Sequence, residues 1–305
     1  MDGTTCQPVL ATVTAPGDEP VDMCVGQSDF FVDELYLALI EAEEYADVSS
    51  LTQPDGRFLA GLRNALSYLD AAESEARIRV LFGHIPGLTL DTDEILDDLT
   101  RDLSFGSNLT VHVGAYRIGY TSWNHSKIVA ADGQVLLQGG HNLWTVDYLL
   151  TDPVHDLSMR MDGTAAMDAH RFLDRLWEYT CEDYWFSGLT ERSVYPDTED
   201  SCPEEYAGSY PEQFDDGRVR VISAGRLGEL GENPADEAIL AAIGSAQSSV
   251  KLSIQDIGPI RVAGDLSLSD WPDDVMRELS YAMSDDVDVF MALSTPSSTP
   301  GGGSN

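Results

Sequence analysis

The stretch NHSKIVAADGQVLLQGGHNLW (Asn124–Trp144) decides how the chain is interpreted. It begins with the order H-x-K-x-x-x-x-D, in which His125 and Lys127 are two residues apart and Asp132 follows. On a strand, residues two apart point to the same face, so an imidazole and an ammonium would meet at one point. An ammonium attracts an anion, and an imidazole nitrogen is a nucleophile. The pattern therefore predicts an anion site that contains its own nucleophile.

A pair of glycines follows on the next predicted strand. Gly139 and Gly140 mark a corner of the backbone, and Asn142 lies just beyond it, where its amide is expected to donate to the same anion. Lysine is scarce in the chain, because Lys127 and Lys251 are the only lysines among 17 basic residues. Because lysine is so rare in this chain, a lysine two residues after a histidine is improbable as a chance arrangement.

Composition places the chain among globular proteins and limits its partners. Of 305 residues, 43% are hydrophobic and 23% are charged, which suits one large or two smaller domains. The formal net charge is -36, from 53 acidic and 17 basic residues, so general nucleic-acid binding and attraction to an anionic membrane are excluded. No run of about 18 apolar residues occurs, so no transmembrane segment is predicted.

The first residues contain no basic stretch followed by an apolar one, so no signal peptide is visible. We expect a secreted or periplasmic protein if a leader is missing and a cytoplasmic one otherwise.

The four cysteines fall into two local pairs, Cys6 with Cys24 and Cys181 with Cys202. Their spacing suits two disulfides, and free thiols are the alternative. No CxxC pair or neighbouring pair of histidines accompanies them, so we expect no metal site. Two disulfides would indicate an oxidising compartment.

Helical and strand patterns alternate along the first half of the chain. This alternation favours an α/β/α sandwich around a mainly parallel sheet. The dipeptide Asp132–Gly133 interrupts it, because it is typical of a tight hairpin between two short strands. The predicted helices cover 31–46, 57–72 and 92–103, and the predicted strands cover 48–52, 76–83 and 109–116.

A polar stretch with several prolines separates this part from a second part with the same order of elements. VDELYLALIEAEEYADVSSLTQP (Val32–Pro54) and ADEAILAAIGSAQSSVKLSIQDI (Ala235–Ile257) read as the same helix-then-strand unit. The second part is predicted to run strand, helix, strand, helix and strand, starting with VRVISA (Val219–Ala224). The predicted organisation is an N-terminal extension (1–30), a first module (31–189), a linker (190–217), a partial second module (218–293) and a disordered tail (294–305).

These motifs resemble those of the phospholipase D superfamily, in which His-x-Lys-x(4)-Asp is followed by a Gly-Gly/Ser-x-Asn corner. The segment Tyr148–Trp177 resembles the one that follows the first motif in bacterial phospholipase D enzymes, and Ser249–Pro259 resembles the opening of their second half. The resemblance covers the chain from about Phe31 to Leu293. It implies one complete phospholipase D-like α/β/α module and a truncated second one.

The resemblance also implies a mechanism and a set of roles. Two modules pair; one histidine attacks phosphorus to give a phosphohistidine, and the other protonates the leaving group. His125 would be the nucleophile, while Lys127 and Asn142 would hold the non-bridging phosphate oxygens. Asp132 would be a structural carboxylate that does not touch the substrate. Asp156 would accept a hydrogen bond from the opposite module's histidine, and the alternative is a strand-edge carboxylate that faces solvent. No cofactor is implied.

One departure from the family pattern limits the expected activity. No second H-x-K occurs after Lys127, and no histidine follows His170. A phosphodiesterase that hydrolyses phospholipids, or transfers the phosphatidyl group to an alcohol, is therefore expected to be impaired without a second H-x-K-bearing module. The alternatives are a truncated, non-catalytic half that binds phosphate, and a single-motif homodimeric phosphodiesterase or nuclease. The charge of -36 disfavours the nuclease.

Residues around the motif are candidates for substrate binding. Gly139 and Gly140 would line the anion site. Trp123 and Trp144, with Tyr148, would form an aromatic rim that receives a lipid headgroup or a cation. The alternative is that these aromatic side chains belong to the hydrophobic core.

Overall fold

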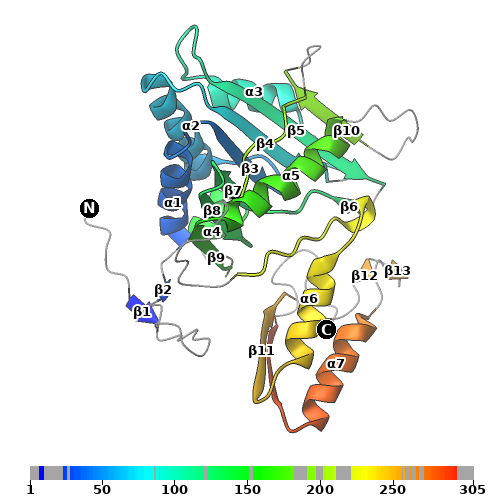
Figure 1. Ribbon diagram of the computed structural model, residues 1–305. Helices are drawn as coiled ribbons and strands as arrows, with labels where there is room; N and C mark the ends of the chain where they lie inside the picture. The colour runs from blue at the N-terminus through cyan, green and yellow to red at the C-terminus, as the bar shows by residue number, and fades with distance from the viewer. Residues whose placement is uncertain are drawn as a thin grey trace. The chain divides into compact units, whose positions relative to one another are not determined.

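The computed structural model divides the chain into two compact units, residues 1–223 and 224–305, and each is described by itself (Figure 1). Among the described residues, no helix is long and apolar enough to cross a lipid bilayer. The structure describes residues 7–9, 23–25, 28–85, 87–88, 90–119, 122–150, 154, 156–181, 191–196, 202–210, 221–255, 257, 261–262, 266–267 and 271–293.

The first unit is built on an eight-stranded mixed sheet. Its order is β10-β5-β4-β3-β7-β8-β9, and β6 pairs with β5. Only the neighbours β3, β4 and β5 run parallel, and the other described pairs of this sheet are antiparallel. The strands are β3 (Tyr45–Ser50), β4 (Arg77–Gly83), β5 (Thr110–Ile118), β6 (Ser122–Trp123), β7 (Ile128–Ala131), β8 (Val135–Gly139), β9 (Ser158–Asp162) and β10 (Glu191–Tyr195).

The expectation of a mainly parallel sheet is therefore wrong, although the α/β/α arrangement is confirmed. Between β5 and β9 the strands are joined by short connections and the short helix α4 instead of long crossover helices, and such connections join antiparallel neighbours. The predicted hairpin at Asp132–Gly133 is confirmed between β7 and β8. Three residues, 132–134, lie between the paired Ala131 and Val135, and Asp132 and Gly133 both have positive φ, +49° and +66°.

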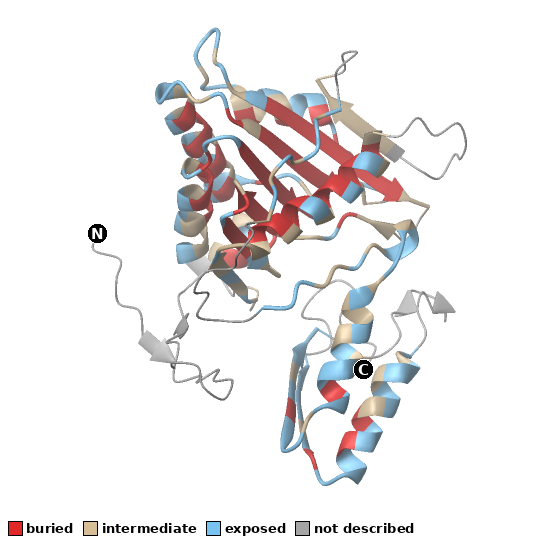
Figure 2. Cartoon of the chain, viewed as in Figure 1, coloured by how far each residue is buried: buried red, intermediate tan, exposed pale blue. Residues whose placement is uncertain are grey.

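Helices cover both faces of this sheet (Figure 1). α1 (Ser28–Ile40), α2 (Gly56–Ala71) and α3 (Thr92–Thr100) lie on one face, and α5 (Ala165–Cys181) crosses the other. α4 (Thr145–Leu149) is a short helix after β8. The strands β3, β4 and β5 form the buried centre of the unit (Figure 2).

Alternation along β3 and β4 separates two kinds of interior. Val48 and Val80 belong to the apolar core beneath α1, α2 and α3. Asp47 and Arg79, one position earlier on each strand, face α5 instead. The position of each residue in the pleat therefore determines which face of the sheet its side chain points to.

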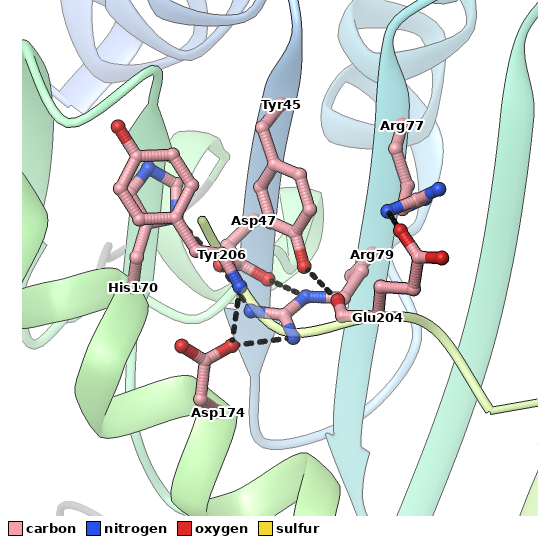
Figure 3. A network of polar contacts seen from close by, with 8 residues as sticks. All are labelled: Tyr45, Asp47, Arg77, Arg79, His170, Asp174, Glu204 and Tyr206. Carbon is pink, nitrogen blue, oxygen red and sulfur yellow. Dashed lines mark hydrogen bonds and ion pairs between the residues drawn. The ribbon is translucent and has the colours of Figure 1, made fainter. Parts of the chain in front are cut away.

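A buried ionic network lies on the α5 face (Figure 3). Arg79 forms a two-pronged contact with Asp47, with Nε–Oδ1 and Nη2–Oδ2 distances of 2.8 Å, and its Nη1 lies 2.7 Å from Asp174 of α5. Nδ1 of His170, also on α5, lies 2.6 Å from Asp47. Burial alone would raise the pKa of Asp47, but the charge of Arg79 and hydrogen bonds from His170 and Arg79 outweigh it and hold the pKa below its ordinary value.

Part of the stretch predicted as a linker contacts this network. The ring of Tyr206 stacks on His170 with centroids 4.2 Å apart, and the hydroxyl of Tyr45 donates to the Glu204 carbonyl at 2.7 Å (Figure 3). A disulfide joins Cys181 to Cys202, with Cα atoms 5.8 Å apart, and so ties the end of α5 to this stretch. The described residues 202–210 thus lie on the first unit.

The other cysteine pair is described only in part. Cys24 lies in β2 (Met23–Val25), which pairs antiparallel with β1 (Gln7–Val9). Cys6 lies outside the described residues. The disulfide between Cys6 and Cys24 stays a prediction.

The second unit packs two helices on a two-stranded parallel sheet of β11 and β14. Its small core consists of Ile243, Val250, Leu279, Ala282 and Val287. The predicted strand at its start is wrong for the described residues 221–224, which form no strand; Val221 and Ile222 are exposed and have no paired strand beside them. The elements are the 3-10 turn η1 (Gly228–Leu230), α6 (Pro234–Gly244), β11 (Ser249–Ile254), α7 (Asp273–Ser284), β14 (Asp288–Leu293) and the short pair β12 (Arg261–Val262) and β13 (Leu266–Ser267).

Removal of the guanidinium at the centre of the network is expected to destabilise the first unit. Arg79→Met leaves the carboxylates of Asp47 and Asp174 without their cation, which for a buried pair costs about 3–5 kcal/mol of unfolding free energy. Urea denaturation at neutral pH measures this loss.

Arg175→Met is the matched control. Arg175 is exposed on α5 and pairs with Glu178, so its replacement is expected to change stability by less than about 1 kcal/mol. Equal effects of the two substitutions would mean that the network contributes nothing to the free energy of unfolding.

The stability of the first unit also depends on pH through Asp47. Because the pKa of Asp47 is lowered in the folded state, its contribution to the free energy of unfolding is present above the ordinary carboxyl pKa and is lost as the pH falls through the folded value.

Candidate active site

The motif lies at the edge of the sheet where the parallel strands end. β7 pairs antiparallel with β3 so that Ile128 lies opposite Ser49, near the carboxyl end of β3. β8 then returns to the same edge, where the Gly139 amide donates to the carbonyl of Lys127 at 3.3 Å. The segments 124–127 and 139–142 therefore lie side by side beyond the strand ends.

His125 and Lys127 lie just before β7, not within the strand. The Nζ of Lys127 donates to the backbone carbonyl of His125 at 2.8 Å. This hydrogen bond places the Lys127 ammonium against the backbone of His125 and does not depend on strand alternation. The convergence of the two side chains on one anion stays a prediction.

The surroundings of the pair favour a neutral imidazole beside a charged ammonium. The side chain of His125 is exposed, yet the protein around it removes enough water, and Lys127 adds enough positive charge, to lower the pKa of His125 from 6.5 to about 4. Burial lowers the pKa of Lys127 to about 8, against an opposing effect from Asp156. Between about pH 4 and pH 8, His125 carries a free nitrogen lone pair while Lys127 carries a positive charge.

The glycine corner lets two strands approach closely. A Cβ at Gly139 would overlap the Leu157 carbonyl and Ser158, and one at Gly140 would overlap the carboxylate of Asp156. Substitution of either glycine would push β9 away from the motif. The two glycines therefore set how near Asp156 comes to the site.

Asn142 lies buried just after this corner. Its Nδ2 donates to the hydroxyl of Tyr148 at 3.4 Å, and its Oδ1 accepts no hydrogen bond from the described residues. A buried amide with an unsatisfied oxygen is costly unless a ligand or water completes it. Asn142 thus keeps an unsatisfied acceptor next to the motif, and only the second N–H of its Nδ2 is a donor suited to an anion.

Asp156 is half-buried at the same edge. One carboxylate oxygen accepts from the Leu157 amide at 2.8 Å, and the other lies 3.4 Å from the Tyr148 hydroxyl. Its charge acts on Lys127, as the pKa of that lysine shows. No hydrogen bond between Asp156 and His125 occurs among the described residues, so this carboxylate lies beside the site without holding that imidazole.

Asp132 lies at the opposite end of β7 from His125. Its carboxylate accepts hydrogen bonds from the backbone amides of Glu43, Glu44 and Tyr45 at 2.6, 3.1 and 2.7 Å. It thereby fixes the loop that enters β3. This geometry fits a structural role and no contact with the substrate.

The aromatic candidates are anchored in the fold. The indole Nε1 of Trp144 donates to Thr52 at 2.8 Å, and Tyr148 is 5% exposed and belongs to the core. Trp123 is half-buried in β6, where it packs against Gly83. His141 has no role in the expectations from the sequence, yet its ring stacks on that of Phe31 with centroids 4.8 Å apart, so this buried side chain supports the glycine corner.

Comparison with known proteins agrees with this architecture. No family model matches the chain. Phosphatidylserine synthase from Haemophilus influenzae has a TM-score of 0.55 at 12% identity, over 88% of this chain and 60% of that one. NucT from Helicobacter pylori has a TM-score of 0.37 at 11% identity, over 50% of this chain and 89% of that one. Nuc from Salmonella typhimurium, a phospholipase D family member, has a TM-score of 0.33 at 10% identity, over 48% and 84%.

The chain has the fold of the phospholipase D superfamily. In sequence it is similar to phospholipase D from Streptomyces antibioticus, with 33% identity over 210 residues, which is 65% of this chain and 37% of that protein. The chain thus spans little more than a third of the curated relative that it matches.

The low pKa of His125 can be measured directly. In an NMR titration of the imidazole signals, we expect His125 to titrate near pH 4, below its ordinary value of 6.5. Lys127→Met removes the second cause of the shift but not the first, so the midpoint is expected to rise part of the way towards 6.5.

Lys251→Met is the control for this experiment, because Lys251 is an exposed lysine of the second unit. It is expected to leave the His125 titration unchanged. A midpoint near 6.5 in the unsubstituted protein would contradict the electrostatics described for the site.

Proposed function

We propose that the chain carries the nucleophilic half of a phospholipase D-type phosphodiesterase, with His125 as the nucleophile. The observation that carries the proposal is the Lys127–His125 hydrogen bond in a segment that lies beside the one carrying Asn142, beyond one edge of the sheet. A neutral imidazole beside an ammonium and a buried amide suits attack on an anionic phosphodiester. The fold and the relative named phospholipase D support the same class of reaction.

The first chemical step forms one bond and breaks one bond. An imidazole nitrogen of His125 donates its lone pair to phosphorus, a P–N bond forms, and the P–O bond to the leaving alcohol breaks with its electron pair on oxygen. Lys127 and Asn142 hold the non-bridging oxygens as their charge grows. Water or an alcohol then attacks phosphorus and gives its proton to the conjugate base of the acid that protonated the leaving oxygen, while the P–N bond breaks with its electron pair on the nitrogen of His125.

The leaving oxygen requires a proton from a second acid. The 305-residue sequence contains a single H-x-K pattern, which is formed by His125 and Lys127, and no histidine follows His170. We assign the acid to a histidine of a second H-x-K-bearing segment or of a second copy of the chain. Asp156, half-buried beside the site and not bonded to His125, is the carboxylate that would orient it.

The substrate in this proposal is a phospholipid. A net charge of -36 repels a polyanion such as nucleic acid, whereas a single phosphodiester group in a zwitterionic headgroup meets little repulsion. The relative named phospholipase D supports this choice. Hydrolysis and transfer to an alcohol both follow from the phosphohistidine.

The test separates the nucleophile from the acid by choice of leaving group. Bis(p-nitrophenyl) phosphate releases a stable phenolate without protonation, so the chain alone is expected to release about one equivalent and to retain a covalent adduct on His125. Phosphatidylcholine requires the acid, and choline release is expected to be about 10²–10⁴-fold slower than with a second H-x-K-bearing module added. Mass spectrometry of the trapped adduct identifies the residue.

Two variants complete the experiment. His125→Ala is expected to abolish the adduct, and Lys127→Met to slow its formation by roughly 10²–10³-fold, the usual effect of losing one stabilising donor. Lys251→Met is the matched lysine control. No adduct, with inorganic phosphate still bound, would favour the non-catalytic phosphate-binding half. Rapid hydrolysis of phosphatidylcholine by the monomer alone would contradict the need for a second histidine.

A further inference from the structure

Asn124, immediately before His125, is among the most buried polar residues of the first unit, at 1% exposure. Its Nδ2 lies 2.9 Å from the Ser49 Oγ, 3.2 Å from the Ser50 carbonyl and 3.1 Å from the Leu81 carbonyl. These acceptors belong to the ends of β3 and β4. One amide group therefore ties the motif to two neighbouring strands.

The other end of the same amide holds the residue after His125. Its Oδ1 accepts from the backbone amide of Ser126 at 3.2 Å and from the Ser126 Oγ at 2.7 Å. A side-chain oxygen that accepts from the amide two residues on closes an Asx turn, with His125 at its tip. The Ser126 Oγ also lies 2.6 Å from the Ser49 Oγ, which returns the turn to β3.

The backbone around Asn124 is equally confined. A Cβ at Gly83 would overlap the Asn124 carbonyl oxygen, so only glycine at the end of β4 lets the segment pass. Gly83 itself donates to the Leu51 carbonyl at 2.9 Å. The turn is therefore held between the ends of β3 and β4 by side-chain and backbone constraints together.

We infer that Asn124 is the positioning residue of the site: its side chain fixes the turn that presents the imidazole of His125 and lets Lys127 bond to the His125 carbonyl. His125 and Lys127 precede β7, so strand pairing does not hold the imidazole. The hydrogen bonds of Asn124 to the ends of β3 and β4 and to Ser126 replace that support. This inference rests on the proposed function for its effect on catalysis, but not for its effect on the geometry of His125.

The test substitutes Asn124 and, as a control, another asparagine whose side-chain oxygen accepts a backbone hydrogen bond. Asn124→Ala removes all contacts of the amide. Asn233→Ala, the control, removes an asparagine of the second unit whose Oδ1 accepts from the Gly228 amide at 2.7 Å. The main readout is the NMR titration of His125, which requires no activity.

In Asn124→Ala the released turn is expected to move the imidazole away from the surrounding protein and from Lys127, the two causes of its lowered pKa, so the His125 midpoint rises towards 6.5. The rate of adduct formation from bis(p-nitrophenyl) phosphate is expected to fall roughly 10²-fold, with little change in half-saturation, because misplacement affects the reacting geometry more than binding. Asn233→Ala is expected to change neither quantity.

A residue that only contributes packing would lower stability without moving the His125 titration, and that result in folded Asn124→Ala would overturn the inference. If Asn124→Ala does not fold, Ser126→Ala decides, because it removes only the hydroxyl contacts of the same turn and is expected to move the titration in the same direction by less. No shift in Ser126→Ala would then overturn the inference. Failure of the proposed function would appear as no adduct in the unsubstituted chain, and the titration would still test the role of Asn124.

Discussion

The antiparallel pairing of β7 with β3 is the constraint on which the candidate site depends. It places the amino end of β7 beside the carboxyl end of β3, so that the segment 124–127 lies at the edge where the parallel strands end. The pairing is fixed at both ends by side chains. Asp132 binds three backbone amides at the entry to β3, and Asn124 binds the exits of β3 and β4. Asn124 and Asp132 thus anchor opposite ends of the short strand β7.

Much of this local arrangement could be predicted from the sequence. The hairpin dipeptide, the glycine corner and the order of His125 and Lys127 are short-range signals, and tight turns depend mainly on the residues within them. The direction of the sheet beyond β5 could not be predicted in the same way. The hairpin dipeptide predicts that β7 and β8 run antiparallel to each other, but the alternation of the first half gave no sign that β7 would pair antiparallel with β3 or β9 with β8.

The long-range polar contacts were beyond the reach of sequence patterns. Asp47 and Arg79 are two charges among many in a chain with 53 acidic residues, and nothing nearby in the sequence marks them as partners. Asn124 finds its acceptors 43 to 75 residues away, on two strands. Its role depends on the ends of both strands being brought together, and so it becomes visible only once the sheet is assembled.

The net charge of the chain affects which anions can reach Lys127. The guanidinium of Arg79 is already committed to two carboxylates, whereas the ammonium of Lys127 donates to a carbonyl oxygen. At physiological salt, charges more than about 8 Å apart are largely screened, so the acidic surface acts weakly on a small anion that has reached the site. A polyanion must bring many charges close to the same surface and meets repulsion all along its length. The distribution of charge, a net -36 with an ammonium beside the neutral imidazole of His125, therefore supports the proposed choice of a single phosphodiester group over a polyanion.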